Sequence, residues 1–459
     1  MTTDSSSPEL PSSNAAPQQR LTLFDSTAII VGIIIGSGVY KTAPMIAGCV
    51  PGPLAVLGVW LAGGLFALIG SLCYAELATM FPAEGGDYVF LSRAYGRPVG
   101  LLFAWCELWV VRPGSIGSLA FVFADYANQI LPLGRHALAY YAAGAIAVLS
   151  AINILGVATG KWTQNFLTVA KVVGLLAVVA IGFLYTAPDA PPVKGPSAPN
   201  WGLAMILILY AYGGWNDMAY VGAEVRNPQK NIFRALILGT CAVTLIYALV
   251  NAAFLHALGF DGLCQANAVA ADVARLGAGE WGAKGVSLLV AISALGAVNG
   301  MIFTGGRIYY AMGKEHRWFS LLGQWSPRLG VPAWSLAVQG AVTMAVVLGF
   351  GLAPGDGEAR GFERMVYFAV PAFWLFLFFV SLSLIVLRFR DPERPRPHRA
   401  LFYPLTPLIF AGSCLFMLHA SVTYAWSKRS PEAFWSFGLI AAGLVVCALD
   451  SLISKKSES

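Results

Sequence analysis

Long apolar stretches alternate with short polar connections along nearly the whole chain. About 20 apolar residues are needed to cross the hydrocarbon layer as a helix, so each stretch predicts one transmembrane helix. Shorter runs of four to eight apolar residues, which would indicate strands, are not the repeating unit here. We expect spans at 25–48, 53–79, 96–129, 137–159, 163–187, 201–225, 233–257, 284–313, 332–353, 364–389, 402–426 and 432–453.

The composition supports this interpretation. Hydrophobic residues make up 57% of the chain and charged residues only 11%, whereas a soluble domain carries about 25% charged residues. The missing polar surface indicates that lipid rather than water covers most of the outside. We therefore predict an all-α integral membrane protein of about twelve transmembrane helices, with no room for a large soluble domain.

Basic residues lie at the ends of the apolar stretches and form no continuous stripe, so the net charge of +6 does not indicate nucleic-acid binding. We assign 18 of the 29 Lys and Arg residues to the side of the N-terminus, 8 to the opposite side and 3 to the spans. Cytoplasmic loops carry the basic excess. This predicts a multi-pass protein of the plasma (inner) membrane with both termini cytosolic, including a disordered tail over 1–22 and a short one over 454–459.

Two spans contain glycine interruptions at similar depth. The first span has Gly36 and Gly38 around Ser37, and the sixth span has Gly213 followed by Gly214. Glycine weakens a helix, and lipid offers no water to satisfy the exposed backbone groups. One such pair is explained by close helix packing. Its recurrence five spans later instead favours a transporter built from two inverted repeats.

The two interruptions offer opposite backbone polarity. A half-helix that begins near Val39 presents free N–H groups and a positive dipole end, which suit a carboxylate. A half-helix that ends between Tyr210 and Gly213 leaves carbonyl oxygens, which suit an ammonium group. Together they predict a site for a zwitterionic α-amino acid.

At these residues the chain resembles the amino acid–polyamine–organocation superfamily, and within it the L-type amino acid transporter family and its bacterial relatives. The resemblance extends from residue 23 to about 426. The stretches that carry it are Ile34 to Val39, Tyr74 to Leu77, Gly85 to Tyr88, Arg112 to Ser115, Ala211 to Asn216 with Glu224, Asn227 and Pro228, and Val298 to Gly300.

The resemblance implies a LeuT-like fold with a 5+5 inverted repeat plus two extra helices. The first repeat would cover 23–187, the second 201–390, and the extra helices 401–453. It also implies a set of substrate-binding residues. These are Ile35, Ser37, Gly38 and Val39 on the carboxylate side, Tyr210, Ala211 and Gly213 on the amino side, and Trp215 and Asn216 in the pocket wall, with Trp215 near the outer gate and the Tyr210 ring closing over substrate.

Lys171 lies inside the fifth span, where a lysine is rare and marks function by default. The resemblance places it where sodium-coupled relatives hold an ion, in contact with the first and eighth spans, which argues against sodium coupling. The alternative is that Lys171 snorkels to the cytosolic edge near Lys161. Tyr247 matches a family position close to this lysine, and is either part of a gate or a core tyrosine with a satisfied hydroxyl.

Acidic residues in and near the spans leave several alternatives open. We expect Glu76 and Asp87 to pair with Arg93 or other basic residues. Glu107 and Arg112, five residues apart, are either mutual partners or face a cavity. Asp217 either faces the pocket, which would favour polar or cationic substrates, or pairs locally.

Nothing in the sequence indicates an enzyme. The five histidines show no i, i+4 pair, no Gly-rich phosphate loop follows a strand, and the seven cysteines show no metal-ligand spacing. We expect no cofactor and no metal. Animal members that need a heavy-chain subunit carry a cysteine between spans 3 and 4, and the loop around Leu131 to His136 has none, so we expect no covalent partner.

The sequence therefore predicts a secondary active transporter of amino acids, with neutral L-amino acids as substrates, that works by alternating access in the lipid bilayer. Sodium-independent exchange, proton-coupled uptake and facilitated diffusion remain open. An amino-acid sensor with a transporter fold and a polyamine or cationic amino acid permease are the alternatives.

Overall fold

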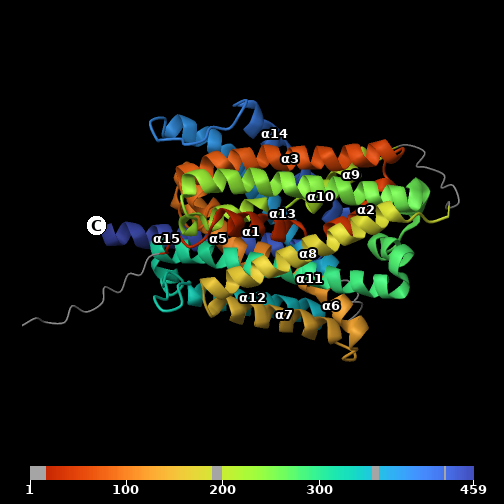
Figure 1. Cartoon of the computed structure of the whole chain (residues 1–459). Coiled ribbons are helices and arrows are strands. Elements are labelled where there is room, and N and C mark those ends of the chain that lie inside the picture. Colours follow the sequence, from red (N-terminus) through yellow and green to blue (C-terminus); the bar gives the residue numbers. More distant parts are fainter. Residues whose placement is uncertain (1–16, 189–198, 354–360, 428–430, 459) are drawn as a thin grey trace, which may run out of the picture.

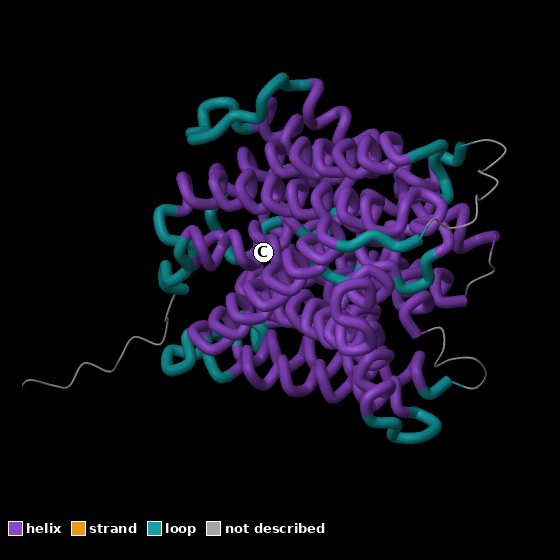
Figure 2. The backbone as a smooth tube through the Cα atoms, turned by 45° about the vertical axis from the view of Figure 1, so that its right-hand side comes forward, coloured by secondary structure: helices purple, strands orange, loops and turns teal. Residues whose placement is uncertain are grey.

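The computed structural model describes residues 17–188, 199–353, 361–427 and 431–458. Over these residues the chain is helical and forms no strand; only three isolated backbone bridges occur. Figure 2 shows the helices lying side by side, with the loops gathered mainly at the two ends of the bundle. The predicted all-α class is confirmed.

The bounds of the elements lie close to most of the predicted spans, although the helices of the seventh and eighth spans are longer than predicted. They are α1 Leu23–Ile34, α2 Gly38–Ala47, α3 Pro53–Met80, α4 Asp87–Tyr95, α5 Arg97–Cys106, η1 Glu107–Val111, α6 Arg112–Ile130, α7 Ala137–Ile154, α8 Val157–Leu184, α9 Trp201–Ala211, η2 Trp215–Tyr220, η3 Gly222–Glu224, α10 Pro228–Gln265, α11 Val269–Glu315, η4 Arg317–Phe319, α12 Ala333–Gly351, α13 Gly361–Arg390, α14 Leu405–Ser427 and α15 Pro431–Glu458.

The described residues provide ten stretches that are long and apolar enough to cross a membrane. The pair α1 and α2, bent by 48° at its break, makes an eleventh. The expected sixth span is interrupted: α9 has 11 residues, which rise only about 16 Å, and 3₁₀ turns follow it. The count of twelve is therefore not confirmed.

Helices that hold the same position in the two predicted repeats pack against each other. This is so for α3 with α10, α6 with α11, and α7 with α12. Outside the two repeats, α14 packs on α13 and α3, and α15 packs on α13 and α5. The described chain begins and ends at the same end of the bundle (Figure 1).

The ordered structure begins before the predicted end of the N-terminal tail. Leu21 is buried; its N–H donates to the Glu224 carbonyl at 2.8 Å, and its own carbonyl accepts from the Arg226 N–H at 2.8 Å. Residues 1–16 of the predicted tail lie outside the described residues. At the other terminus α15 continues to Glu458, so the predicted tail from residue 454 is helical as far as the structure describes it.

Two buried carboxylates near this end of the bundle are paired with arginines from distant helices. Glu224 binds Arg307 through both oxygens, at 2.7 and 3.2 Å, and neither side chain is exposed. Glu76 binds Arg388 at 2.9 and 2.6 Å, so its expected basic partner is not Arg93 but another arginine.

Asp87 behaves differently from the prediction. It accepts a hydrogen bond from the Tyr220 hydroxyl at 2.8 Å, and no basic side chain within the described ranges pairs with it. The expectation of a basic partner for Asp87 is wrong. Its hydrogen-bond donor is instead the tyrosine at the end of the 3₁₀ turn η2.

Breaking the Arg307–Glu224 pair should destabilise the fold strongly. Arg307→Met would leave the Glu224 carboxylate buried and unpaired, a change that costs about 3–5 kcal/mol in the free energy of unfolding. Thermal unfolding of the purified protein in detergent would measure it. The control is Arg275→Met, which removes an exposed pair with Asp272 and Glu280; equal melting temperatures for the two variants would contradict the prediction.

Candidate functional site

The first span is broken where its glycines predict a break. Helix α1 ends at Ile34 and α2 begins at Gly38, and Ile35 between them has ψ 76°, outside the helical region. The Ser37 side chain does not cap α2. Because the first turn of a helix has no intrahelical acceptors for its N–H groups, the start of α2 is a set of donors with a positive dipole end.

The sixth span is broken at a matching position. Helix α9 ends at Ala211 and the 3₁₀ turn η2 begins at Trp215. Gly214 has φ +113°, a conformation that favours glycine, and the Gly213 N–H donates to the Tyr210 carbonyl at 3.2 Å. The last turn of α9 thus presents carbonyl oxygens close to the donors of α2.

Gly38 allows the two half-helices to approach each other. A Cβ atom at this position would lie 3.2 Å from Cα and 3.3 Å from Cβ of Ala211, tighter than ordinary contact. The absence of a side chain on Gly38 therefore sets the spacing between α2 and the end of α9.

Lys171 fastens the first break to the rest of the molecule. Its side chain is fully buried, and its ammonium group donates to the carbonyls of Gly32 at 2.8 Å, Ile35 at 2.7 Å and Ser293 at 2.9 Å. It lies on α8 and joins α1 to α11, the first and eighth spans. It does not snorkel toward Lys161; its predicted role in coupling stays a prediction.

Tyr247 of α10 connects the two breaks directly. Its hydroxyl lies 3.0 Å from the Ile34 carbonyl and 3.2 Å from the Ala211 carbonyl. The ring is buried and packs edge-on against Trp60 and Tyr212. Tyr247 is therefore both a core residue and a polar partner of the interrupted backbone.

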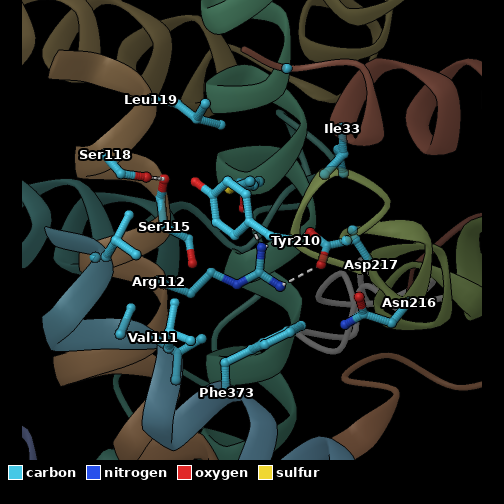
Figure 3. A pocket seen from close by; sticks show the side chains of 18 of the residues that line it. Ile33, Val111, Arg112, Ser115, Ser118, Leu119, Tyr210, Asn216, Asp217 and Phe373 are labelled. Carbon is cyan, nitrogen blue, oxygen red and sulfur yellow. Dashed lines mark hydrogen bonds and ion pairs between the residues drawn. The ribbon is translucent and has the colours of Figure 1, made fainter. Parts of the chain in front are cut away.

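A cavity of about 130 Å³ lies between the two breaks, α6 and α13. Figure 3 shows its labelled side chains converging from α1, η1, α6, α9, η2 and α13. Six of the predicted binding residues line it: Ser37, Gly38, Tyr210, Ala211, Gly213 and Asn216. Ser118 of α6 and Phe373 of α13 also line it. They could not be predicted from the sequence, because neither lies in a recognisable motif.

Three predicted residues do not line the cavity. The Ile35 carbonyl is taken by Lys171 and by the Ser293 hydroxyl at 2.8 Å, and Val39 is completely buried in the core. The Trp215 ring packs against Tyr74 and Phe410, at 5.0 and 5.6 Å between ring centroids. Trp215 thus faces α3 and α14, and its neighbour Asn216 faces the cavity.

A charged cluster forms one wall of the cavity. Arg112 binds Asp217 through two nitrogens at 2.6 and 3.0 Å, and Glu107 through Nε at 2.9 Å. The Thr304 hydroxyl donates to Asp217 at 2.6 Å. Both alternatives considered for these acids hold at once, because Glu107, Arg112 and Asp217 pair with one another and also line the cavity.

A π-helical turn, η1, places two members of this cluster together. Pro113 has no N–H and cannot donate within the helix, and the Arg112 N–H bonds to the Glu107 carbonyl five residues back. Such single π turns are frequent at functional sites. The turn stacks Glu107 and Arg112 on one side of the helix.

Gly38→Leu should abolish uptake of labelled amino acid without preventing folding. The new side chain would push α2 away from Ala211 and separate the donors from the acceptors. The control is Gly58→Leu on α3, where a Cβ would meet no atom within 4 Å. Undiminished uptake by Gly38→Leu protein in proteoliposomes would remove the site from the first break.

Lys171→Ala should lower net uptake at least tenfold or change its pH profile, where tenfold corresponds to about 1.4 kcal/mol. The change removes the ammonium donor from three carbonyls, of which that of Ile35 keeps its bond from the Ser293 hydroxyl. Lys284→Ala, at an exposed position on α11, is the control. A normal rate with a normal pH profile would reject a coupling role for Lys171.

Comparisons with known proteins identify the family to which the chain is similar. Residues 21–446 match the family model described as amino acid permease. The chain is 31% identical to the human b(0,+)-type amino acid transporter 1, over 93% of this chain and 87% of that protein. It is 26% identical to a serine/threonine exchanger of Bacillus subtilis, over 88% and 91%. It is also 28% identical to the mouse large neutral amino acids transporter small subunit 2, over 86% and 75%.

Proposed function

The chain belongs to the amino acid permease family and is an amino acid transporter, and we propose that it exchanges neutral L-amino acids across the plasma membrane by alternating access, independently of sodium. One observation carries the proposal. The donor end of α2 and the acceptor end of α9 face one cavity, and this pair of opposite polarities matches an α-carboxylate and an α-amino group.

The charges of the cavity wall favour a neutral substrate side chain. Asp217 already accepts two hydrogen bonds from Arg112 and one from Thr304. Arg112 in turn has both ends of its guanidinium occupied by Asp217 and Glu107. An acidic substrate side chain could bind Arg112 only by breaking one of these buried pairs, which is unfavourable, whereas a neutral side chain leaves them intact.

A cationic amino acid is the second candidate substrate. The cluster holds two carboxylates, Glu107 and Asp217, for one guanidinium, so it lacks one positive charge if both acids are ionised. A basic substrate side chain would supply that charge. This observation favours cationic over acidic substrates.

Alternating access fits the arrangement of the helices. The interrupted helices hold the site, and helices in the same position of each repeat pack together, as expected for two repeats that rock around a midplane site. Lys171 places a fixed cation at the first break, which supports transport without sodium. Exchange fits a site in which the N–H groups at the start of α2 gain their acceptor from the substrate carboxylate.

The remaining parts of the proposal concern topology and partners. We infer that both termini are cytosolic from the excess of basic residues on that side, and that the protein works without a covalently bound heavy chain, because the loop between α6 and α7 has no cysteine.

An uptake panel in proteoliposomes tests the proposal. Neutral L-amino acids should enter faster when unlabelled amino acid is present inside, with the same rate when sodium is replaced by choline. Proton-coupled uptake would instead be driven by a pH gradient in the absence of internal amino acid. Uptake of labelled arginine tests whether a cationic amino acid is a substrate. Binding without any movement of label would instead indicate a sensor, and a strict need for sodium would contradict the proposal.

A further inference from the structure

The loop between α13 and α14 is unusually rich in arginine. It lies at the end of the bundle where the described chain begins and ends, beside the cytosolic end of α3 in the proposed topology (Figure 1). Within it a cavity of about 180 Å³ is lined by Arg388, Pro392, Arg396 and Arg399. We call this cavity the arginine pocket.

The arginine pocket carries an excess of positive charge. Among the described residues its only acidic partner is Glu76, which binds Arg388 at 2.9 and 2.6 Å and lies 3.5 Å from Arg396. Glu76 also accepts from the Ala400 N–H at 2.6 Å. Arg399 is exposed and makes no hydrogen bond or ion pair within the described chain. Two of the three guanidinium groups therefore share one carboxylate, and the third has no acidic partner among the described residues.

Arg396 is held rigidly at the side of the pocket. Its terminal nitrogens donate to the carbonyls of Pro392, Arg394, Leu387 and Asp391 at 2.7–3.2 Å. Its side chain is only 6% exposed, and its Nε faces Glu76 at 3.5 Å, an ion pair longer than a normal hydrogen bond. Arg396 therefore contributes its charge to the pocket, and the exposed guanidinium of Arg399 supplies donors with the fork geometry that suits a phosphate.

The surroundings of the pocket indicate where that anion comes from. Large apolar side chains flank it in the sequence and are strongly exposed: Phe389 by 78%, Leu401 by 59% and Phe402 by 80%. They lie at the adjoining ends of two membrane-spanning helices, α13 and α14. Apolar groups at this level contact lipid, while the arginines beside them lie at the depth of the headgroups.

We propose that the arginine pocket binds the phosphate group of an anionic phospholipid headgroup. The phosphate balances the excess charge of Arg388, Arg396 and Arg399, and the apolar side chains contact the acyl chains. This inference rests on the membrane-spanning helices and is independent of the substrate proposed above.

The test measures lipid binding to the full-length protein in detergent. Native mass spectrometry and thermal unfolding would be followed while phosphatidylglycerol, phosphatidylcholine or inorganic phosphate is added. Phosphatidylglycerol should bind tightest and raise the melting temperature most. Arg399→Gln should bind it about fivefold more weakly, the change expected for about 1 kcal/mol per arginine near an anionic lipid surface. Arg399 makes no contact that folding needs, so this variant remains interpretable.

The control is Arg328→Gln, another exposed arginine at the same end of the bundle without a bond within the described chain; it should bind phosphatidylglycerol like the unaltered protein. Equal binding by Arg399→Gln protein would overturn the proposal. Inorganic phosphate that stabilises the protein as well as phosphatidylglycerol does would also overturn it, because the site would then serve a soluble anion.

Discussion

The bilayer forces every backbone N–H and carbonyl of this protein to find a partner inside the protein, and the structure follows from how that demand is met at two broken helices. Lys171, Tyr247 and Ser293 take up carbonyls around the first break. Tyr247 also reaches the second break. The backbone N–H groups of the first turn of α2 have no such intrahelical acceptors. Substrate recognition uses the backbone polarity that the fold itself does not satisfy.

Charged side chains inside the bundle must also find their partners within the protein. Several of the described ion pairs inside the helix bundle join elements that are distant in sequence, such as Arg307 with Glu224 and Arg388 with Glu76. Removing one member of such a pair leaves a buried charge alone, which is far more unfavourable than never having had the pair. Where the pairing is incomplete, as in the arginine pocket, the surplus points to a ligand from outside.

Much of this architecture was predictable because apolar length and glycine position are local signals. The spans and both breaks follow from them, and Lys171 was singled out by its depth. The partner of Glu76 was not predictable, since Arg388 lies 312 residues away. Nor was the direction of Trp215, which depends on rings from Tyr74 and Phe410. The π turn before Arg112 could not be predicted. Pro113 shows in the sequence that one backbone hydrogen bond is lost, but not that the helix responds by forming a π turn.

The Tyr247 hydroxyl has one hydrogen but two carbonyls within reach, those of Ile34 and Ala211. At any instant it can serve only one of them. Both oxygens lie within hydrogen-bond distance, so rotation about the C–O bond transfers the hydrogen from one half-helix to the other. If a motion separates the first broken helix from the second, the Tyr247 hydroxyl can remain hydrogen-bonded to only one of them. The direction in which this buried hydroxyl hydrogen points therefore depends on how the two repeats are placed relative to each other.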